Sequence, residues 1–137
     1  MYMETVLMLS SNITFTQTTF AHEAMLEEQH NVHSELFDQL AQTIRSNQWI
    51  WFTSQSIRPS LQQLSASNIP VNQVIQLKAS AHLTEFEVAR KAIKSGNASA
   101  LVVSKQISKL EQNILRDLSD EIGCQLFFID SAKSFYH

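Results

Sequence analysis

Four short apolar runs alternate along the chain with longer segments of helical periodicity. The runs cover residues 49–52, 74–77, 98–103 and 125–129. Their side chains are rich in β-branched and aromatic types and are apolar on consecutive positions, which is typical of strands covered on both faces. Buried strands joined through helices form parallel sheets. The pattern therefore predicts a mainly parallel sheet with helices on both sides.

Two helices are predicted in the first half of the chain. Residues 31–45 form the first, with Ser34 as a suitable N-cap. A shorter helix follows the tryptophan-containing run, where Pro59 suits the first turn and Asn68 ends the helix in a left-handed conformation. The first helix carries an apolar stripe that consists of Leu36, Phe37, Leu40 and Ile44.

Two further helices have capping signals at both ends. Thr84 and Glu87 have the spacing of a capping box, and Gly96 follows the end of that helix. Ser108 begins the last helix in the same way, and Gly123 stops it. The periodic apolar positions of the last helix are Ile107, Leu110, Ile114, Leu118 and Ile122.

Strand and helix alternate through residues 31–130, which predicts one three-layer α/β domain with right-handed crossovers. A chain of 137 residues is long enough for a single core of this kind. Residues 1–30 are threonine-rich near their start and are interpreted as an N-terminal arm or an edge strand. Residues 131–137 are interpreted as an exposed C-terminal tail.

Composition narrows the classes of partner and compartment. The formal net charge of −3 argues against binding to a nucleic-acid backbone. No apolar run is long enough for a membrane span, and the start of the chain lacks the features of a signal peptide. Cys124 is the single cysteine and cannot form an internal disulfide, which favours a reducing compartment. We expect a cytoplasmic protein without a nucleic-acid or membrane partner.

The small number of glycines excludes two common kinds of active site. The chain has only Gly96 and Gly123, and both are explained as helix stops. A phosphate-binding loop needs several glycines, and the nucleophile elbow of serine hydrolases needs two around one serine. In a parallel sheet the ligand normally lies in the loops after the strands, here residues 53–58, 78–84 and 104–108. These loops are polar but carry no recognisable catalytic motif, so no cofactor is expected.

The histidines and carboxylates suggest no strong metal or acid–base site. His22, His30 and His33 lie near several glutamates, but a solvated acidic helix explains them better than a metal site. His82 is expected in a polar loop. The carboxylates expected at helix ends or on solvent-facing surfaces are Glu85, Glu87, Asp117 and Asp120.

The first strand divides its side chains between two faces. Trp49 and Trp51 share one face and are predicted to belong to the core. Phe52 joins Ile50 on the other face. Because Phe52 stands near the end of the strand, it is a candidate anchor that emerges at a binding surface.

The spacing of WIWFT, ASNIPVNQVIQL and AIKSGNASALVV, with Tyr136-His137 at the chain end, resembles the SulA family of bacterial cell-division inhibitors. The resemblance covers residues 36–104 and the tail. It implies a RecA-like fold without a phosphate-binding loop. It also implies a protein of the SOS response to DNA damage that is no enzyme, but binds the tubulin-like GTPase FtsZ and blocks its polymerisation into the division ring.

The resemblance also suggests where a partner would bind. Phe52 matches an apolar family position at the end of the tryptophan strand, and Leu64 approximately matches another in the next helix. Two basic family positions hold Asn47 and Gln73 here, with Arg45, Arg58 and Lys78 as displaced substitutes. The predicted partner-binding residues are Arg45, Asn47, Phe52, Arg58, Leu61, Leu64, Val71 and Gln73.

The chain end has a second implied role. Members of the family are degraded by the Lon protease, and the matching residues for its recognition are Phe135, Tyr136 and His137. Two other functions stay open: a degenerate RecA-like accessory protein that binds DNA-repair partners, and a small enzyme that uses His82 or the cluster from His22 to His33. The sequence also leaves open whether the chain forms a homodimer.

Overall fold

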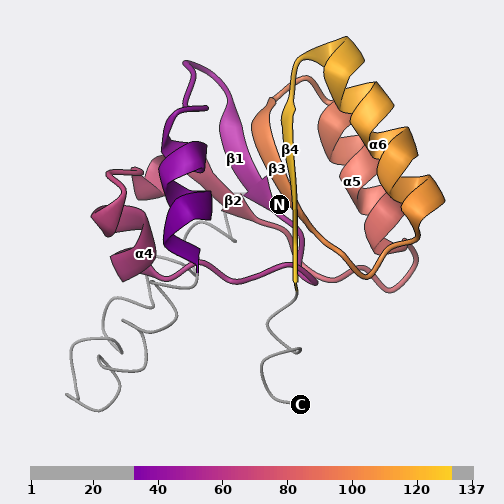
Figure 1. The fold of residues 1–137 in the computed structure, drawn as a ribbon, viewed down its shortest axis with the longest axis horizontal. Coiled ribbons are helices and arrows are strands. Elements are labelled where there is room, and N and C mark those ends of the chain that lie inside the picture. Colours follow the sequence, from indigo (N-terminus) through magenta and orange to yellow (C-terminus); the bar gives the residue numbers. More distant parts are fainter. Residues whose placement is uncertain (1–32, 131–137) are drawn as a thin grey trace.

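One parallel sheet of four strands forms the centre of the protein in the computed structural model, which describes residues 33–130 (Figure 1). The strands are β1 (Trp49–Phe52), β2 (Val74–Gln76), β3 (Ala98–Ser104) and β4 (Gln125–Ile129). Their order across the sheet is β2-β1-β3-β4, and all neighbours are parallel. These strands lie where the sequence predicts them, and the predicted α/β class is confirmed.

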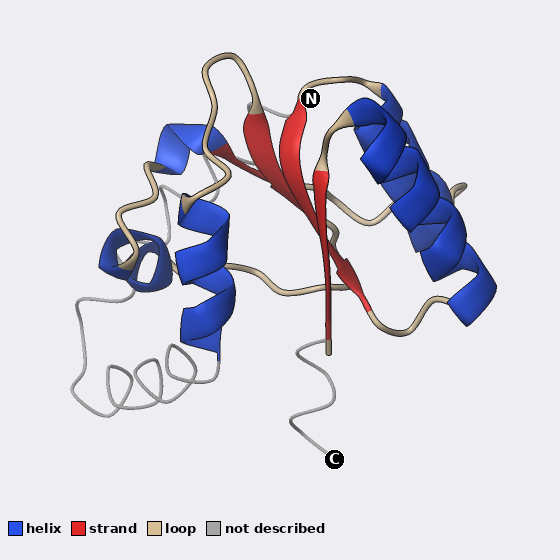
Figure 2. Cartoon of the chain, turned by 45° about the horizontal axis from the view of Figure 1, so that its top comes forward, coloured by secondary structure: helices blue, strands red, loops and turns tan. Residues whose placement is uncertain are grey.

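Helices cover the sheet in two layers (Figure 2). One layer contains the helix over residues 33–41 and α4 (Leu61–Ala66). The other layer contains α5 (Glu85–Lys94) and α6 (Lys109–Ile122), and the 3₁₀ turn η1 (Val71–Gln73) leads into β2. The chain moves one way across the sheet from β1 to β2 and the other way from β2 to β4. Right-handed crossovers in opposite directions place their helices on opposite faces.

The side chains of the strands alternate between two hydrophobic cores. Ile50 and Phe52 face the layer of α4, whereas Trp51 faces α5 and α6, as the alternation predicts. The first core contains Phe37, Leu40, Ile50, Phe52, Ile57, Leu64, Ile69, Val74, Ala100 and Val102. The second core contains Trp51, Ile75, Leu77, Ala89, Ala92, Ile93, Ala98, Leu101, Val103, Leu115 and Cys124.

The helix before β1 is shorter at its end than the sequence predicts. Residue 41 is its last helical residue, so Ile44 lies beyond it, and Ser34 lies within the helix and is no N-cap. The backbone N–H and the hydroxyl of Thr43 both donate to the carbonyl of Leu40, at 2.9 and 2.7 Å, and close the last turn. Asn47 then takes a left-handed φ of 63° and turns the chain into β1.

Most capping predictions are confirmed, with small shifts. Ser108 forms the full capping box of α6, whereas the Thr84 hydroxyl accepts from the Glu87 backbone N–H and donates to the Glu87 carboxylate. Asn68 is left-handed, with φ of 59°. Pro59 lies before the N-cap Ser60 and not in the first turn of α4.

The buried face of α6 agrees only in part with the predicted one: of the predicted apolar positions, Ile107 and Leu118 pack partly buried against the second core. Leu110, Ile114 and Ile122 are 70%, 41% and 41% exposed, whereas Gln112, Leu115 and Ser119 are buried. Residues spaced by four drift about 40° around a helix at each step, so the predicted stripe cannot stay on one flat contact. The Gln112 amide donates to the carbonyls of Lys105 and Ile107, at 3.4 and 3.1 Å, and fixes which face turns inward.

The predictions for residues 1–30 and 131–137 lie outside the described residues. Within residues 33–130, no helix is long and apolar enough to cross a membrane.

Candidate functional site

Two of the predicted contact residues lie in the first core. Phe52 and Leu64 are 0% and 1% exposed. The ring of Phe52 stacks on Phe37 with 6.1 Å between centroids. The expectation that Phe52 emerges at the surface is therefore wrong, because the helix over residues 33–41 covers the end of β1. Because these two side chains are buried, they can influence the binding of a partner only indirectly, by positioning residues at the surface.

Three other predicted contact residues, in or beside α4 and η1, are at least partly accessible to solvent. Leu61, one turn before Leu64, is half-buried, as is Val71, which packs against the first core. Arg58 is exposed in the loop before α4. We call Arg58, Leu61 and Val71 the α4 surface.

This surface rests on a well-fixed short helix. The Ser60 hydroxyl accepts from the Gln63 backbone at 3.0 Å, and the Gln63 side chain accepts from the Ser60 backbone at 2.9 Å. At the other end, Ile69 donates its N–H to the Leu64 carbonyl at 2.8 Å. Both ends of α4 are thus closed by local hydrogen bonds, although the helix has only six residues.

Asn47 and Gln73 both precede neighbouring strands at the amino edge of the sheet. Ile50 pairs with Val74, so both residues precede strands that start side by side. The Trp49 indole donates to the Asn72 carbonyl at 3.1 Å and links the two turns. Asn47 is exposed, whereas Gln73 is half-buried and its Oε1 has no hydrogen-bond partner within the described structure.

Arg45 is directed away from these residues. Its Nη1 lies 3.5 Å from the carbonyl of Gly123, just before β4. Because β4 and β2 are at opposite ends of the sheet, Arg45 is not brought to Gln73. Burial raises the pKa of the neighbouring Cys124 thiol to about 11, and the charge of Arg45 opposes that rise.

A buried carboxylate occupies the opposite, carboxyl edge of the sheet. The strand order reverses between β1 and β3, the place where parallel α/β sheets commonly hold ligands. Glu85, the first residue of α5, is only 7% exposed there. Its carboxylate accepts from the Thr53 hydroxyl at 2.6 Å, the Ser104 backbone at 2.7 Å and the Ser104 hydroxyl at 2.6 Å.

The prediction that Glu85 lies on a solvent-facing helix end is therefore wrong. The sequence does contain one signal for the cluster, because Thr53 and Ser104 place hydroxyl groups at the ends of two buried strands. Both oxygens of the carboxylate accept hydrogen bonds from these donors. The arrangement is that of a structural anchor.

The histidines do not form a site in the described part of the chain. His22 and His30 lie outside it, and burial lowers the pKa of His33. His82 is exposed in the loop before α5, as predicted, and its backbone N–H donates to the Ser80 hydroxyl at 3.1 Å. Within residues 33–130, no three His, Cys, Asp or Glu side chains are placed to hold a metal ion.

A solved structure has a fold similar to that of this chain. The crystal structure of SulA from Pseudomonas aeruginosa is similar with a TM-score of 0.56 over 73% of this chain and 84% of that chain. The two sequences are 12% identical, so this likeness concerns the fold.

The family follows from the sequence. The family described as "Cell division inhibitor SulA" matches residues 19–123, and the chain belongs to this family. No curated protein sequence matches the chain.

Proposed function

We propose that this protein binds FtsZ and blocks its polymerisation into the division ring during the SOS response to DNA damage. The family match carries the proposal, because it spans residues 19–123 and so includes the whole segment from Arg45 to Gln73. In this role the protein acts in the cytoplasm as a binding protein and not as an enzyme.

The α4 surface is the contact that we favour. A stable interface buries roughly 1,200–2,000 Å² and is centred on apolar, aromatic or arginine side chains. Leu61 and Val71 are half-buried and supply apolar area, and Arg58 supplies an exposed guanidinium in the loop before α4. Gln73 is half-buried at the end of η1, and because its Oε1, unpaired within the described residues, is buried, it is not counted in this contact. Phe52 and Leu64 are buried and act as positioning residues for the α4 surface.

Sedimentation of FtsZ polymers with GTP tests the proposed activity. We expect pelleted FtsZ to fall as the protein is added and to vanish near an equimolar ratio, because a blocked subunit cannot join a filament. Unchanged polymer at a several-fold excess would contradict the proposal.

Variants separate contact from positioning. Leu61→Asp and Arg58→Glu should raise the concentration needed for inhibition at least tenfold and leave the melting temperature within a few degrees. Lys91→Glu, an exposed change on α5 in the opposite layer, is the matched control and should inhibit normally. Phe52→Ala should lower the free energy of unfolding by about 3–5 kcal/mol. Normal inhibition by both surface variants would place the contact elsewhere.

We also propose that Lon protease recognises Phe135, Tyr136 and His137, which lie outside the described residues. Support comes from the matching chain end of the family alone. Deletion of Tyr136 and His137 should lengthen the half-life of the protein in cells that contain Lon and leave it unchanged in cells that lack Lon. An unchanged half-life in both strains would remove this proposal.

A further inference from the structure

The outer edge of β4 is unpaired within the described part of the chain. β4 is the last strand of the sheet and pairs only with β3. The Lys105 N–H donates to the Ile129 carbonyl at 2.7 Å, so the backbone groups of Ile129 point toward β3. Because backbone direction alternates along a strand, Leu126 and Phe128 direct their N–H and C=O groups outward. Such an edge can accept another strand.

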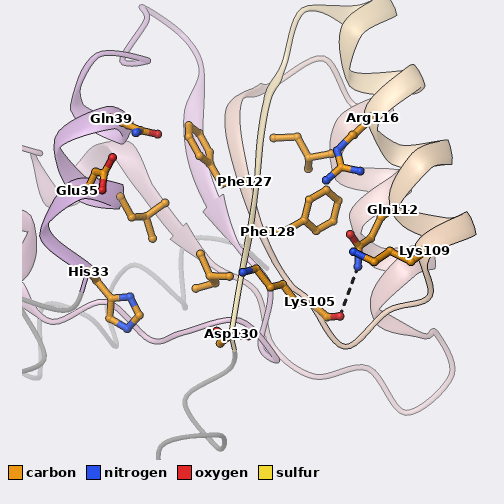
Figure 3. A pocket seen from close by; sticks show the side chains of 13 residues that line it. His33, Glu35, Gln39, Lys105, Lys109, Gln112, Arg116, Phe127, Phe128 and Asp130 are labelled. Carbon is orange, nitrogen blue, oxygen red and sulfur yellow. Dashed lines mark hydrogen bonds between the residues drawn. The ribbon is translucent and has the colours of Figure 1, made fainter.

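A groove of about 630 Å³ runs along this edge (Figure 3). The helix over residues 33–41 forms one wall, and the β3–α6 loop and α6 form the other. Residues 126–129 of β4 are half-buried at its floor. Leu126 and Phe128 belong to the side of the second core, whereas Phe127 and Ile129 belong to the side of the first. A strand added here would therefore present alternate side chains to two different walls.

The two walls differ in charge. The α6 wall carries Lys105, Lys109 and Arg116, and no acidic residue of that wall lines the described groove. The Arg116 guanidinium lies 4.9 Å from the centroid of the Phe128 ring, which holds it over the strand. Three cations on one wall contrast with the net charge of −3 of the whole chain.

The opposite wall is mixed. It offers Leu36 and Gln39, together with His33 and Glu35. Asp130 adds an acidic group where β4 ends. Leu36 of this wall, together with Phe127 and Ile129 of the floor, offers the apolar surface on this side of the groove.

We propose that the β4 edge binds an extended segment of a partner protein in which acidic residues alternate with apolar ones. The segment adds as a fifth strand to the sheet. Its acidic side chains meet Lys105, Lys109 and Arg116, and its apolar side chains pack on Leu36 and Phe127. The β4 edge is at the other end of the sheet from β2 and η1, so this site is separate from the α4 surface and its test does not depend on FtsZ.

Peptide binding to the full-length chain tests the pattern. The probe is a fluorescein-labelled nonapeptide of alternating glutamate and valine, followed by fluorescence anisotropy. We expect it to bind at least tenfold more tightly than a matched peptide of alternating lysine and valine, and more weakly as salt is raised. Equal binding of the two peptides, or binding of neither, would overturn the proposal.

Two kinds of variant examine the wall and the backbone separately. Lys109→Glu combined with Arg116→Glu should weaken binding of the glutamate peptide at least tenfold, whereas Lys91→Glu combined with Lys94→Glu on α5 should not. Leu126→Pro removes one outward N–H and should weaken binding strongly relative to Leu126→Ala, which keeps it. Binding that survives both the charge reversal and the proline would overturn the proposal.

Hydrogen exchange of individual amides shows what covers the edge. In the free protein the Leu126 and Phe128 amides should exchange much faster than those of Phe127 and Ile129, and the glutamate peptide should slow them. Slow exchange of all four amides without peptide would mean that residues 1–32 or a second copy already pairs with β4, and that result would overturn the proposal. Concentration dependence of the exchange distinguishes these two occupants.

Discussion

The carboxylate of Glu85 joins the ends of two strands to the start of a helix. Thr53 follows β1 and Ser104 ends β3, and both donate hydroxyl groups to this one buried side chain. A buried charge is tolerated only when hydrogen bonds replace its lost hydration. Here the three donors also fix the position of α5 relative to the sheet.

Removing this carboxylate should destabilise the fold. We expect Glu85→Ala to lower the free energy of unfolding by about 2–4 kcal/mol, because it leaves three buried donors without their acceptor. Urea denaturation measures the change. Glu121→Ala, an exposed carboxylate at the end of α6, should change the free energy by no more than about 0.5 kcal/mol. Equal effects of the two substitutions would show that Glu85 is not an anchor.

The Cys124 thiol should make stability depend on pH in alkaline solution. Its pKa is about 11 in the folded chain because of burial, against the ordinary value of 9.0. Between these values the unfolded chain loses the proton first, so its contribution to stability is complete below pH 9 and is lost as pH rises toward 11. The loss is on the order of 2 kcal/mol. Cys124→Ala should flatten the unfolding free energy over this window; an unchanged slope would contradict the assignment.

At the scale of elements, α6 shows that contact decides which face of a helix is buried. Its buried face contains one large apolar side chain, Leu115, together with Gln112 and Ser119. The Ser119 carbonyl accepts from the N–H groups of Gly123 and Cys124 at 2.7 and 3.0 Å, and Gly123 is left-handed with φ of 93°. The Gln112 side chain thus fixes the start of the helix, and the Ser119 backbone carbonyl fixes its end. Leu115 is buried in the second core, and Leu118 packs partly buried against it.

Truncation of two leucines of α6 should have very different effects on the free energy of unfolding. Leu115→Ala should lower the free energy of unfolding by about 2–5 kcal/mol, because Leu115 is fully buried. Leu110→Ala should change it by less than about 0.5 kcal/mol, because this side chain is 70% exposed. Chemical denaturation of both variants measures the difference. A large cost at Leu110 would mean that another surface covers this position in solution.

For the whole molecule, one thin sheet separates the two cores. Residues of β1 alternate between them, so neither core exists without the strands that also form the other. The crossover directions place α4 on one face and α5 and α6 on the other, and the helix over residues 33–41 lies on the face of α4 (Figure 1). The protein should therefore unfold as one cooperative unit, as most single domains of this size do.

The costs in unfolding free energy of substitutions in the two cores should be additive. The protein should also unfold in a single transition. Leu40→Ala and Leu115→Ala remove side chains from opposite faces that share no contact cluster. Their costs in the double variant should sum to within about 0.5 kcal/mol. Tryptophan fluorescence and far-UV circular dichroism should give the same urea midpoint. Separate midpoints would show that the two layers are independent units.

The sequence by itself determined the strands, most helix ends and the α/β class. These features depend on residues close in the chain: the consecutive apolar side chains of Trp49–Phe52, the capping box at Ser108 and the glycine stop at Gly123. The family spacing of tryptophan and proline is likewise written in the sequence. Local signals of this kind are readable because each is complete within a few residues.

Only the tertiary structure decided which of these residues face solvent. Phe52 is buried because a helix from another part of the chain covers it, and Glu85 turns inward because Thr53 and Ser104 meet it there. Arg45 and Gln73 are separated because the strand order puts β2 and β4 at opposite ends. Exposure and proximity depend on contacts between distant segments, so the folded chain decided which of the predicted contact residues can reach a partner and showed the groove at β4.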